Sequence, residues 1–395
     1  MMTVTETTAS LLRAVEKLQP LIAEHNAKAE SERQLSKEVY EAMFDANLYA
    51  MLTPKAYGGL ELHPFEAMLV WEAVSRIDSA AGWNLAMNGA ITGWFAWLPA
   101  DGANEILADG PTTAAGALFP NQPATRVDGG WRVTGQVPFA SGCTNSKWLA
   151  IPAVEMDGDE PKVDPETGEP APFGIFFSRE EAQIRDTWHT VGMRGTGSAD
   201  IVVENLFVPD RRSFVVKPLE RPAPGFEGPL YRMVPWLTIL GEATVSVGVA
   251  AAAVDALVNL AQTKTPAYNT TPLREQQLAQ FFVAKAKAKV EAARDTLCRA
   301  AEEAYEDVRS GSLLSRAAKI RLQLAVSFAA EVCAEAVRLV CDGAGSSSIR
   351  TTQPFERYLR DSQVLTQHSD KSSPRYMTAG RLIFGLENDW VWLSF

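Results

Sequence analysis

Two acid–base candidates stand out among the side chains of this sequence. His368 lies in the segment Gln367-His368-Ser369-Asp370, and its imidazole would titrate near neutral pH. Its spacing alone is equally compatible with a solvated histidine near a helix end. Glu242 follows the start of an apolar helix, where a glutamate is more often an ordinary helix-face residue than a perturbed acid. The residue types therefore suggest proton transfer, without fixing which group performs it.

The motifs of several other enzyme classes are absent. The four histidines lie far apart and no HExxH segment occurs, so we expect no metal site. No GxxxxGK[ST] loop and no GxSxG elbow is present. Gly195-Thr196-Gly197 and Gly343-Ala344-Gly345 lack a third glycine and open no βαβ unit, which argues against a Rossmann fold. The four cysteines form no CxxC pair and are expected to be reduced, buried thiols.

Composition narrows the classes further. The chain has 395 residues, 37 basic and 48 acidic, and a net charge of −11, which argues against nucleic-acid and anionic-lipid partners. The polar first residues lack the pattern of a secretory signal. The most apolar stretch, residues 243–254, is too short to cross a bilayer. We expect a cytoplasmic globular protein with no membrane partner.

The elements that must position these residues change character twice along the chain. Residues 5–110 show helical spacing of apolar residues. Residues 113–216 contain alternating strand-like runs, and Asp128-Gly129-Gly130 predicts a hairpin. Residues 155–172, rich in acids and prolines, are expected to form a solvated loop.

From about residue 230 the chain is helical again. Two long helices are expected over residues 274–309 and 313–341, and one or two more over residues 354–385. The predicted fold class is α+β, with an N-terminal helical domain, a central β-domain and a C-terminal helical bundle. The predicted domain bounds are residues 1–112, 113–217 and 218–395.

Four stretches, in this order, resemble the acyl-CoA dehydrogenase family of flavoproteins. The resemblance covers nearly the whole chain and implies an acyl-CoA dehydrogenase-like fold. The stretches are Pro54–Gly59 with Ser75–Ala80, Gly129–Gly142, Gly192–Val208 and Phe355–Asp361.

Two departures from the dehydrogenase pattern bear on the chemistry. Many dehydrogenases carry a catalytic glutamate about nine residues after the Arg-Asp pair, where this chain has Ser369. Leu118–Pro123 replaces the family's Thr-Glu-Pro segment. Gln367–Asp370, Phe139–Cys143 and Gly192–Ser198 are similar instead to the two-component (group D) flavin monooxygenases, which include dibenzothiophene monooxygenase and the oxygenase component of 4-hydroxyphenylacetate hydroxylase.

This resemblance implies an oxygenase component that takes reduced FMN or FAD from a separate NAD(P)H-flavin reductase. With O2 as co-substrate, a C4a-hydroperoxyflavin would oxygenate a small aromatic or heteroaromatic substrate, in a homotetramer. An acyl-CoA dehydrogenase or a nitroalkane-oxidase-type flavoenzyme is the alternative, which the missing glutamate disfavours unless Glu242 is the base. A non-enzymatic helical interaction protein is disfavoured by the flavin-domain motifs.

The resemblance also implies roles for single residues. His368 would set the protonation of the peroxide or activate the substrate, Ser141 would lie near flavin N5, and Asn121 could donate to the peroxide. A turn serine and a loop asparagine are the plain alternatives for the last two. Phe119, Phe139, Ser141 and Trp188 would bind the flavin ring.

Further cofactor contacts are implied at subunit interfaces. Arg274 would reach the flavin phosphate, and Gly343, Ala344 and Gly345 would offer backbone amides to a neighbour's flavin. An exposed helix-start arginine and a helix C-cap glycine are the alternatives. Trp83 and Met87, four residues apart, could line the substrate pocket or pack in the core.

Overall fold

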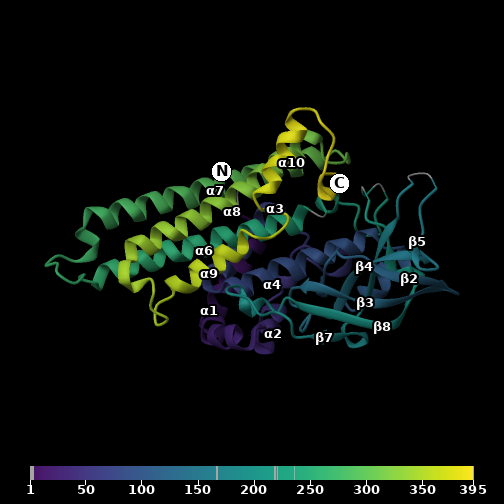
Figure 1. Cartoon of the computed structure of the whole chain (residues 1–395), viewed down its shortest axis with the longest axis horizontal. Helices are drawn as coiled ribbons and strands as arrows, with labels where there is room; N and C mark the ends of the chain where they lie inside the picture. Colours follow the sequence, from purple (N-terminus) through teal and green to yellow (C-terminus); the bar gives the residue numbers. More distant parts are fainter. Residues whose placement is uncertain (1–3, 166–167, 218, 220, 235, 395) are drawn as a thin grey trace.

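The computed structural model describes residues 4–165, 168–217, 219, 221–234 and 236–394. Its architecture consists of N-terminal helices, a central sheet and a C-terminal helical bundle, as predicted. The bundle and the sheet lie at opposite ends of the molecule, and the first two helices lie below the bundle in the view of Figure 1. The meeting point of the three parts is where the functional site is found.

The N-terminal helices begin at residues that can cap them. The side chains of Thr5, Ser36 and Asp78 accept hydrogen bonds from backbone N–H groups in the first turns that follow, which satisfies donors that have no partner within the helix. Every residue of the fourth helix is buried, so this helix forms the centre of the structure. The helices are α1 (Glu6–Glu32), α2 (Lys37–Asp45), α3 (Pro64–Ile77), α4 (Ser79–Ala90) and α5 (Ala100–Ile106).

The sheet follows the order β7-β8-β3-β2-β4-β6-β9, with β1 and β5 pairing with β4. The hairpin predicted at residues 128–130 joins β2 and β3. The acidic segment at residues 155–172 is not a plain loop, because its start continues β4, β5 folds back on it and β6 begins at its end. The main strands are β1 (Ala114–Gly116), β2 (Gln122–Val127), β3 (Gly130–Ala140), β4 (Trp148–Asp157), β6 (Pro172–Ser178) and β8 (Ala199–Pro209); the short ones are β5 (Glu160–Pro161), β7 (Gln183–Arg185) and β9 (Ser213–Phe214).

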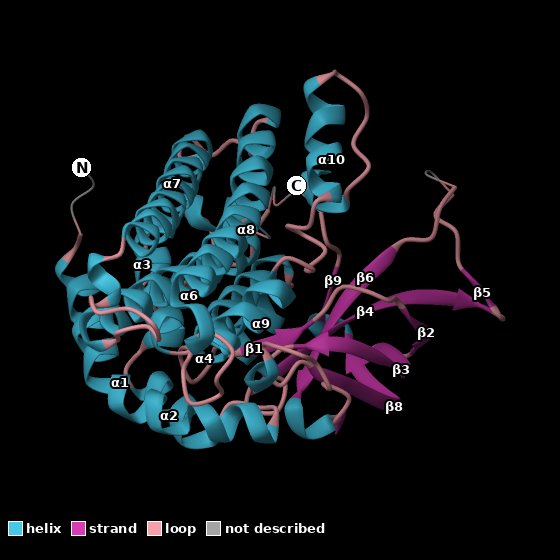
Figure 2. Cartoon of the chain, turned by 60° about the vertical axis from the view of Figure 1, so that its left-hand side comes forward, coloured by secondary structure: helices cyan, strands magenta, loops and turns pink. Residues whose placement is uncertain are grey.

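The bundle covers one side of the molecule, and the sheet lies on the other (Figure 2). Arg274 lies in a 3₁₀ turn, Leu273–Glu275, rather than at the start of the long helix expected there, which begins at Gln277. The stretch at residues 354–385 forms two helices. The bundle helices are α6 (Trp236–Thr263), α7 (Gln277–Val308), α8 (Arg316–Ala344), α9 (Phe355–Leu365) and α10 (Pro374–Ile383).

Helix α6 extends well beyond residues 243–254, the apolar stretch that is too short by itself to cross a bilayer. Within the described part of the chain it is the one helix whose length and hydropathy would allow it to cross a membrane, but 94% of its most apolar window is buried inside the structure. Helices α3, α4 and α8 pack against it. Its apolar surface is therefore accounted for by the core of the protein.

Candidate active site

A cavity of about 590 Å³ opens where α4, the end of β3, α6 and the segment after α9 meet. Its wall is mostly apolar, and all of its charged side chains lie at the end formed by α6 and the α9–α10 segment. Six lining residues carry aromatic rings: Trp83, Trp94, Phe119, Phe139, Trp188 and Trp390. An apolar cavity with polar groups gathered at one end is the usual form of a site for a small organic ligand.

His368 and Glu242, distant in sequence, meet at the polar end. His368 Nδ1 lies 2.9 Å from Glu242 Oε2 and 3.9 Å from Asp370 Oδ2. The side chain of Glu242 is only 2% exposed, whereas that of His368 is 35% exposed. The imidazole thus stands between the buried carboxylate and the cavity. Nδ1 thus faces Glu242, and the backbone N–H of Asp370 also points at it at 3.5 Å, which leaves Nε2 as the ring nitrogen available to a ligand.

The electrostatics of this end favour a charged imidazole. Burial by itself would lower the pKa of His368, but the carboxylates of Glu242 and Asp370 outweigh it and raise the pKa above its usual range. Behind the pair, the Lys371 ammonium donates to the backbone oxygen of Glu242 at 2.8 Å. Burial lowers the pKa of Lys371 to about 8, against the opposing effect of the two carboxylates.

A chain of polar groups leads away from His368 along the cavity wall. The rings of His368 and Trp83 meet edge to face with centroids 5.5 Å apart. Trp83 Nε1 donates to Ser141 Oγ at 2.8 Å, Ser141 Oγ is 2.7 Å from Ser198 Oγ, and Ser198 Oγ is 2.8 Å from Thr196 Oγ1. The Ser141 hydroxyl is therefore held in place at the cavity wall by Trp83 and Ser198.

The backbone at Ser141 is fixed by the buried helix α4. Asn88 Nδ2 donates to the Ser141 carbonyl at 2.8 Å, and Gly142 N donates to Thr196 O at 2.9 Å. Gly142 has a φ of 72°, and a Cβ there would lie closer than 3.0 Å to the side chains of Asn84 and Asn88. Glycine is therefore the only residue that fits where the backbone comes this close to Asn84 and Asn88.

A buried carboxylate, Asp361, holds the part of the wall that contains Met193. Asp361, in the motif Phe355–Asp361, accepts from the backbone N–H of Met193 at 2.6 Å and from Ser79 Oγ at 2.5 Å. Arg357 pairs with it at 3.5 Å and with Asp78 at 2.6 Å. These contacts tie α9 and α4 to the loop that carries Met193, which lines the cavity. Asp361 of the Arg-Asp pair therefore supports the structure of the site.

The cavity suits the isoalloxazine ring of a flavin. Phe139 sits at a break in the β3–β8 register with a φ of 64°, so its side chain leaves the sheet and is 67% exposed. Phe119 is 55% exposed, and the Trp188 ring meets Phe139 edge to face at 6.2 Å. Large exposed rings around an open, mostly apolar cavity match a planar ring system, and the Ser141 hydroxyl lies in the same wall.

The same polar end contains ligand types for a metal ion. Atoms of Glu242, His368 and Asp370 that could hold one lie within 4.8 Å of one another. The 2.9 Å contact between His368 and Glu242 already has the distance of an ion pair. The cluster is accounted for without a metal.

The structure brings seven of the predicted site residues to this cavity: Trp83, Met87, Phe119, Phe139, Ser141, Trp188 and His368. The other five predicted residues lie elsewhere. Asn121 is exposed and outside the wall, Arg274 donates to Gln262 Oε1 at 3.3 Å on the surface, and residues 343–345 form the end of α8, where Lys264 Nζ donates to Ala344 O at 2.7 Å. The roles assigned to these residues remain predictions.

Several residues of the site were missed in the sequence. Thr196 and Ser198 belong to the motif Gly192–Ser198, which could have pointed to them. No sequence motif points to Trp94, Trp390 or Lys371, because their position beside the cavity depends on how distant segments of the chain pack together. Glu242 was left open as a base, and its carboxylate proves to be buried behind His368.

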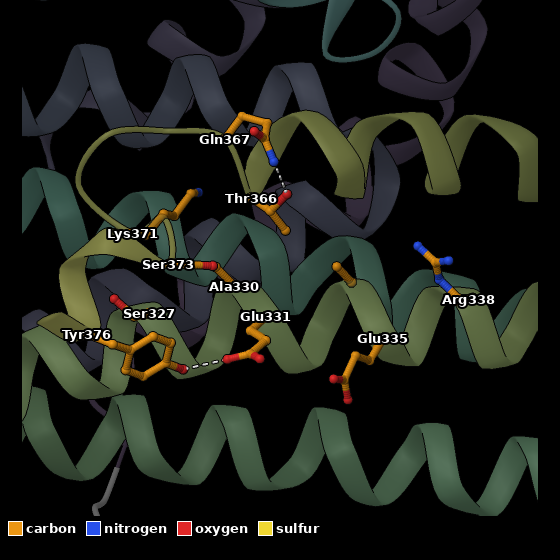
Figure 3. A pocket seen from close by; sticks show the side chains of 11 residues that line it. Ser327, Ala330, Glu331, Glu335, Arg338, Thr366, Gln367, Lys371, Ser373 and Tyr376 are labelled. Carbon is orange, nitrogen blue, oxygen red and sulfur yellow. Dashed lines mark hydrogen bonds between the residues drawn. The ribbon is translucent and has the colours of Figure 1, made fainter.

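A second cavity, of about 300 Å³, lies against α8 on the outer side of the segment that follows α9 (Figure 3). Glu331, Glu335, Arg338 and Tyr376 line it, and Tyr376 Oη donates to Glu331 at 2.8 Å. Lys371 also lines it, although this residue is only 2% exposed. Lys371 therefore lies between the outer cavity and the Glu242–His368 pair.

Comparisons with known proteins agree with this architecture. Residues 5–98 match the family "Acyl-CoA dehydrogenase, N-terminal domain", and residues 240–372 match "Acyl-CoA dehydrogenase, C-terminal domain". The chain is 32% identical to an indole-3-acetate monooxygenase of Pseudomonas putida over 357 residues, covering 90% of this chain and 88% of the relative. It is 27% identical to HsaA, a flavin-dependent monooxygenase oxygenase subunit of Mycobacterium tuberculosis, over 95% of this chain and 96% of HsaA.

Solved structures extend the similarity to a flavin complex. XiaF from Streptomyces sp., in complex with FADH2 and glycerol, has a TM-score of 0.88 and 25% identity, covering 98% of this chain and 97% of XiaF. An indole-bound dibenzothiophene monooxygenase of Paenibacillus sp., TdsC, has a TM-score of 0.81 at 15% identity, covering 96% of this chain and 98% of TdsC, and so shares the fold.

Proposed function

The chain belongs to the acyl-CoA dehydrogenase family, and within it to the reduced-flavin-dependent monooxygenases that act as oxygenase components; on that premise we propose that it oxygenates a small aromatic or heteroaromatic substrate beside His368. The observation that carries the proposal is the pairing of a cavity-facing imidazole with a buried carboxylate in an aromatic cavity. Indole-3-acetate, resorcinol and indole appear in the names of similar proteins and define the substrate class to test.

Reduced FMN or FAD, when bound, activates dioxygen for transfer of one oxygen atom to the substrate. The residues of this chain would do the rest. Phe119, Phe139 and Trp188 would hold the ring and exclude water, and the Ser141 hydroxyl would hydrogen-bond its polar edge. His368 would exchange a proton with the substrate through Nε2, while Glu242 holds Nδ1–H and so positions the imidazole. Trp83 and Met87 would contact the substrate ring.

The burial of Glu242 favours oxygenation over dehydrogenation as the reaction. A base that removes a substrate proton must reach that proton, and the Glu242 carboxylate is 2% exposed with His368 in front of it. Among the described residues, Asp370 is the one further carboxylate that lines the cavity. A positioning role for Glu242 fits these contacts better than a role as base.

The direct experiment supplies the protein with anaerobically reduced FMN or FADH2 and mixes it with oxygenated buffer in a stopped-flow instrument. A transient near-ultraviolet absorbance that differs from oxidised flavin, followed by hydroxylated product when an aromatic compound is present, is expected. Bleaching of bound oxidised flavin by acyl-CoA thioesters or nitroalkanes, with no oxygenated product, would contradict the proposal.

An oxygenase component of this kind receives its reduced flavin from a separate reductase. We further propose that the chain works in the cytoplasm as a homotetramer. The exposed apolar side chains of Leu278, Phe281, Ile383 and Phe384 support self-association, because isolated chains seldom expose such groups in number. Size-exclusion chromatography with light scattering would give the mass, and a monomeric mass would contradict this part.

A further inference from the structure

The charges at the cavity define which substrates it can accept. Among the described residues that line the cavity, none is a lysine or an arginine. The charged lining groups are Glu242, His368 and Asp370. A ligand inside the cavity therefore finds one imidazole as the sole possible cation of the wall, and that imidazole already faces two carboxylates at 2.9 and 3.9 Å.

The two other cations near this end are engaged elsewhere. Lys371 Nζ donates to the backbone oxygen of Glu242 and lies 4.9 Å from the centre of the Trp83 ring, and its side chain lines the outer cavity of Figure 3. The Arg375 guanidinium stacks on Trp390 at 3.8 Å, near Asp370 and Asp389, and does not line the substrate cavity. Neither cation therefore lines the cavity that a substrate would enter.

We infer that this cavity selects aromatic substrates that carry no carboxylate and that present an uncharged hydroxyl, which can accept from or donate to the imidazole, to His368 Nε2. The inference rests on the proposed function and narrows its substrate class. A substrate carboxylate bound at Nε2 would be the third carboxylate around one imidazole. Burying three carboxylates around one possible cation is costly, whereas a neutral hydroxyl can hydrogen-bond to Nε2 without adding a charge.

The inference separates this chain from a relative at 32% identity whose name contains a carboxylated substrate, indole-3-acetate. Both could accept the indole ring in an aromatic cavity. The charge at the polar end, rather than the shape of the walls, would then distinguish what each can bind. A pair of ligands that differ in charge but hardly in shape tests this point directly.

Indole-3-acetate and indole-3-acetamide form such a pair. Isothermal titration calorimetry at pH 7.5, on the protein loaded with oxidised FMN or FAD, would measure the Kd of each. Leaving one charged group unsatisfied predicts that the amide binds about 30-fold more tightly than the acid. An acid that binds as tightly as the amide would overturn the inference.

The Asp370→Asn variant gives an internal control, because it removes one carboxylate while keeping the size of the side chain. It should narrow the difference in Kd between the two ligands severalfold, and an unchanged difference would refute the role of cavity charge. If neither ligand binds and no aromatic compound yields product, the proposed function fails and the inference fails with it. If indole-3-acetate both binds tightly and yields product, the proposed function stands and only the charge inference is overturned.

Discussion

Replacing Gly142 with alanine should destabilise the protein and displace Ser141 at the same time. At a φ of 72° an alanine costs about 1–2 kcal/mol relative to glycine. Its Cβ would also meet the side chains of Asn84 and Asn88, which must move. Their amide groups donate to Ala80 O at 3.0 Å and to Ser141 O at 2.8 Å.

Each of those hydrogen bonds contributes about 0.5–1.5 kcal/mol, and more where the carbonyl left behind is buried. The free energy of unfolding should therefore fall by about 3–5 kcal/mol, a large part of the about 5–15 kcal/mol typical of a folded protein. Because Asn88 anchors the Ser141 carbonyl, the hydroxyl should also leave its position between Trp83 and Ser198. We expect reduced flavin to be oxidised with more hydrogen peroxide and less product.

Gly129→Ala is the matched control. Gly129 has a φ of 73°, in the β2–β3 turn, but nothing lies within 4 Å of a Cβ there. This variant should lose only the about 1–2 kcal/mol of the backbone conformation and keep its product yield. Urea unfolding followed by far-ultraviolet circular dichroism measures both variants. Equal losses for the two glycines would refute the reasoning that α4 fixes the backbone at Ser141.

Three further variants test the polar end. His368→Ala should keep the fold and flavin binding but lose product formation by about 100-fold or more, as for loss of a general acid–base group, and normal hydroxylation would show that His368 has no such role. Glu242→Gln should shift the His368-dependent limb of the pH–activity profile to lower pH, because its carboxylate raises the pKa of His368; an unmoved limb would contradict a positioning role. Lys371→Met removes a buried ammonium whose pKa is lowered from 10.5 to about 8. The free energy of unfolding of the wild type, relative to this variant, should therefore rise by about 3 kcal/mol as the pH increases from 7 to 10.5, because folding no longer requires loss of the proton. Urea unfolding measures it, and a difference that does not change with pH would refute the burial of the charge.

The sequence revealed the architecture because its signals were local. Asp128-Gly129-Gly130 predicted a hairpin, because Asp-Gly favours a tight turn, and the structure has that hairpin between β2 and β3. The helix expected at Arg274 was placed too early, because Pro272 and the turn after it precede Gln277. The apolar run at 243–254 gave only part of α6, since both ends of that helix contain polar residues.

The site was predictable only where a motif brought its residues together. Phe139, Ser141 and His368 lay in recognisable segments, and the structure places all three at one cavity. The partnership of His368 with Glu242 could not be predicted, because 126 residues separate them and only the packing of α6 against the segment after α9 makes them neighbours. Trp390 and Lys371 join the site for the same reason.

The polar end of the cavity and the part of its wall that lies in the loops of the sheet come from different segments of the chain. Glu242 and His368 lie on α6 and after α9, whereas Leu118, Phe119 and Thr190 lie in loops attached to the sheet. Mutant libraries confined to those loop positions would therefore vary the size and shape of the ring that fits, while the proton-handling pair stays untouched. The scaffold offers protein engineers two separately adjustable properties, ring selection and proton chemistry.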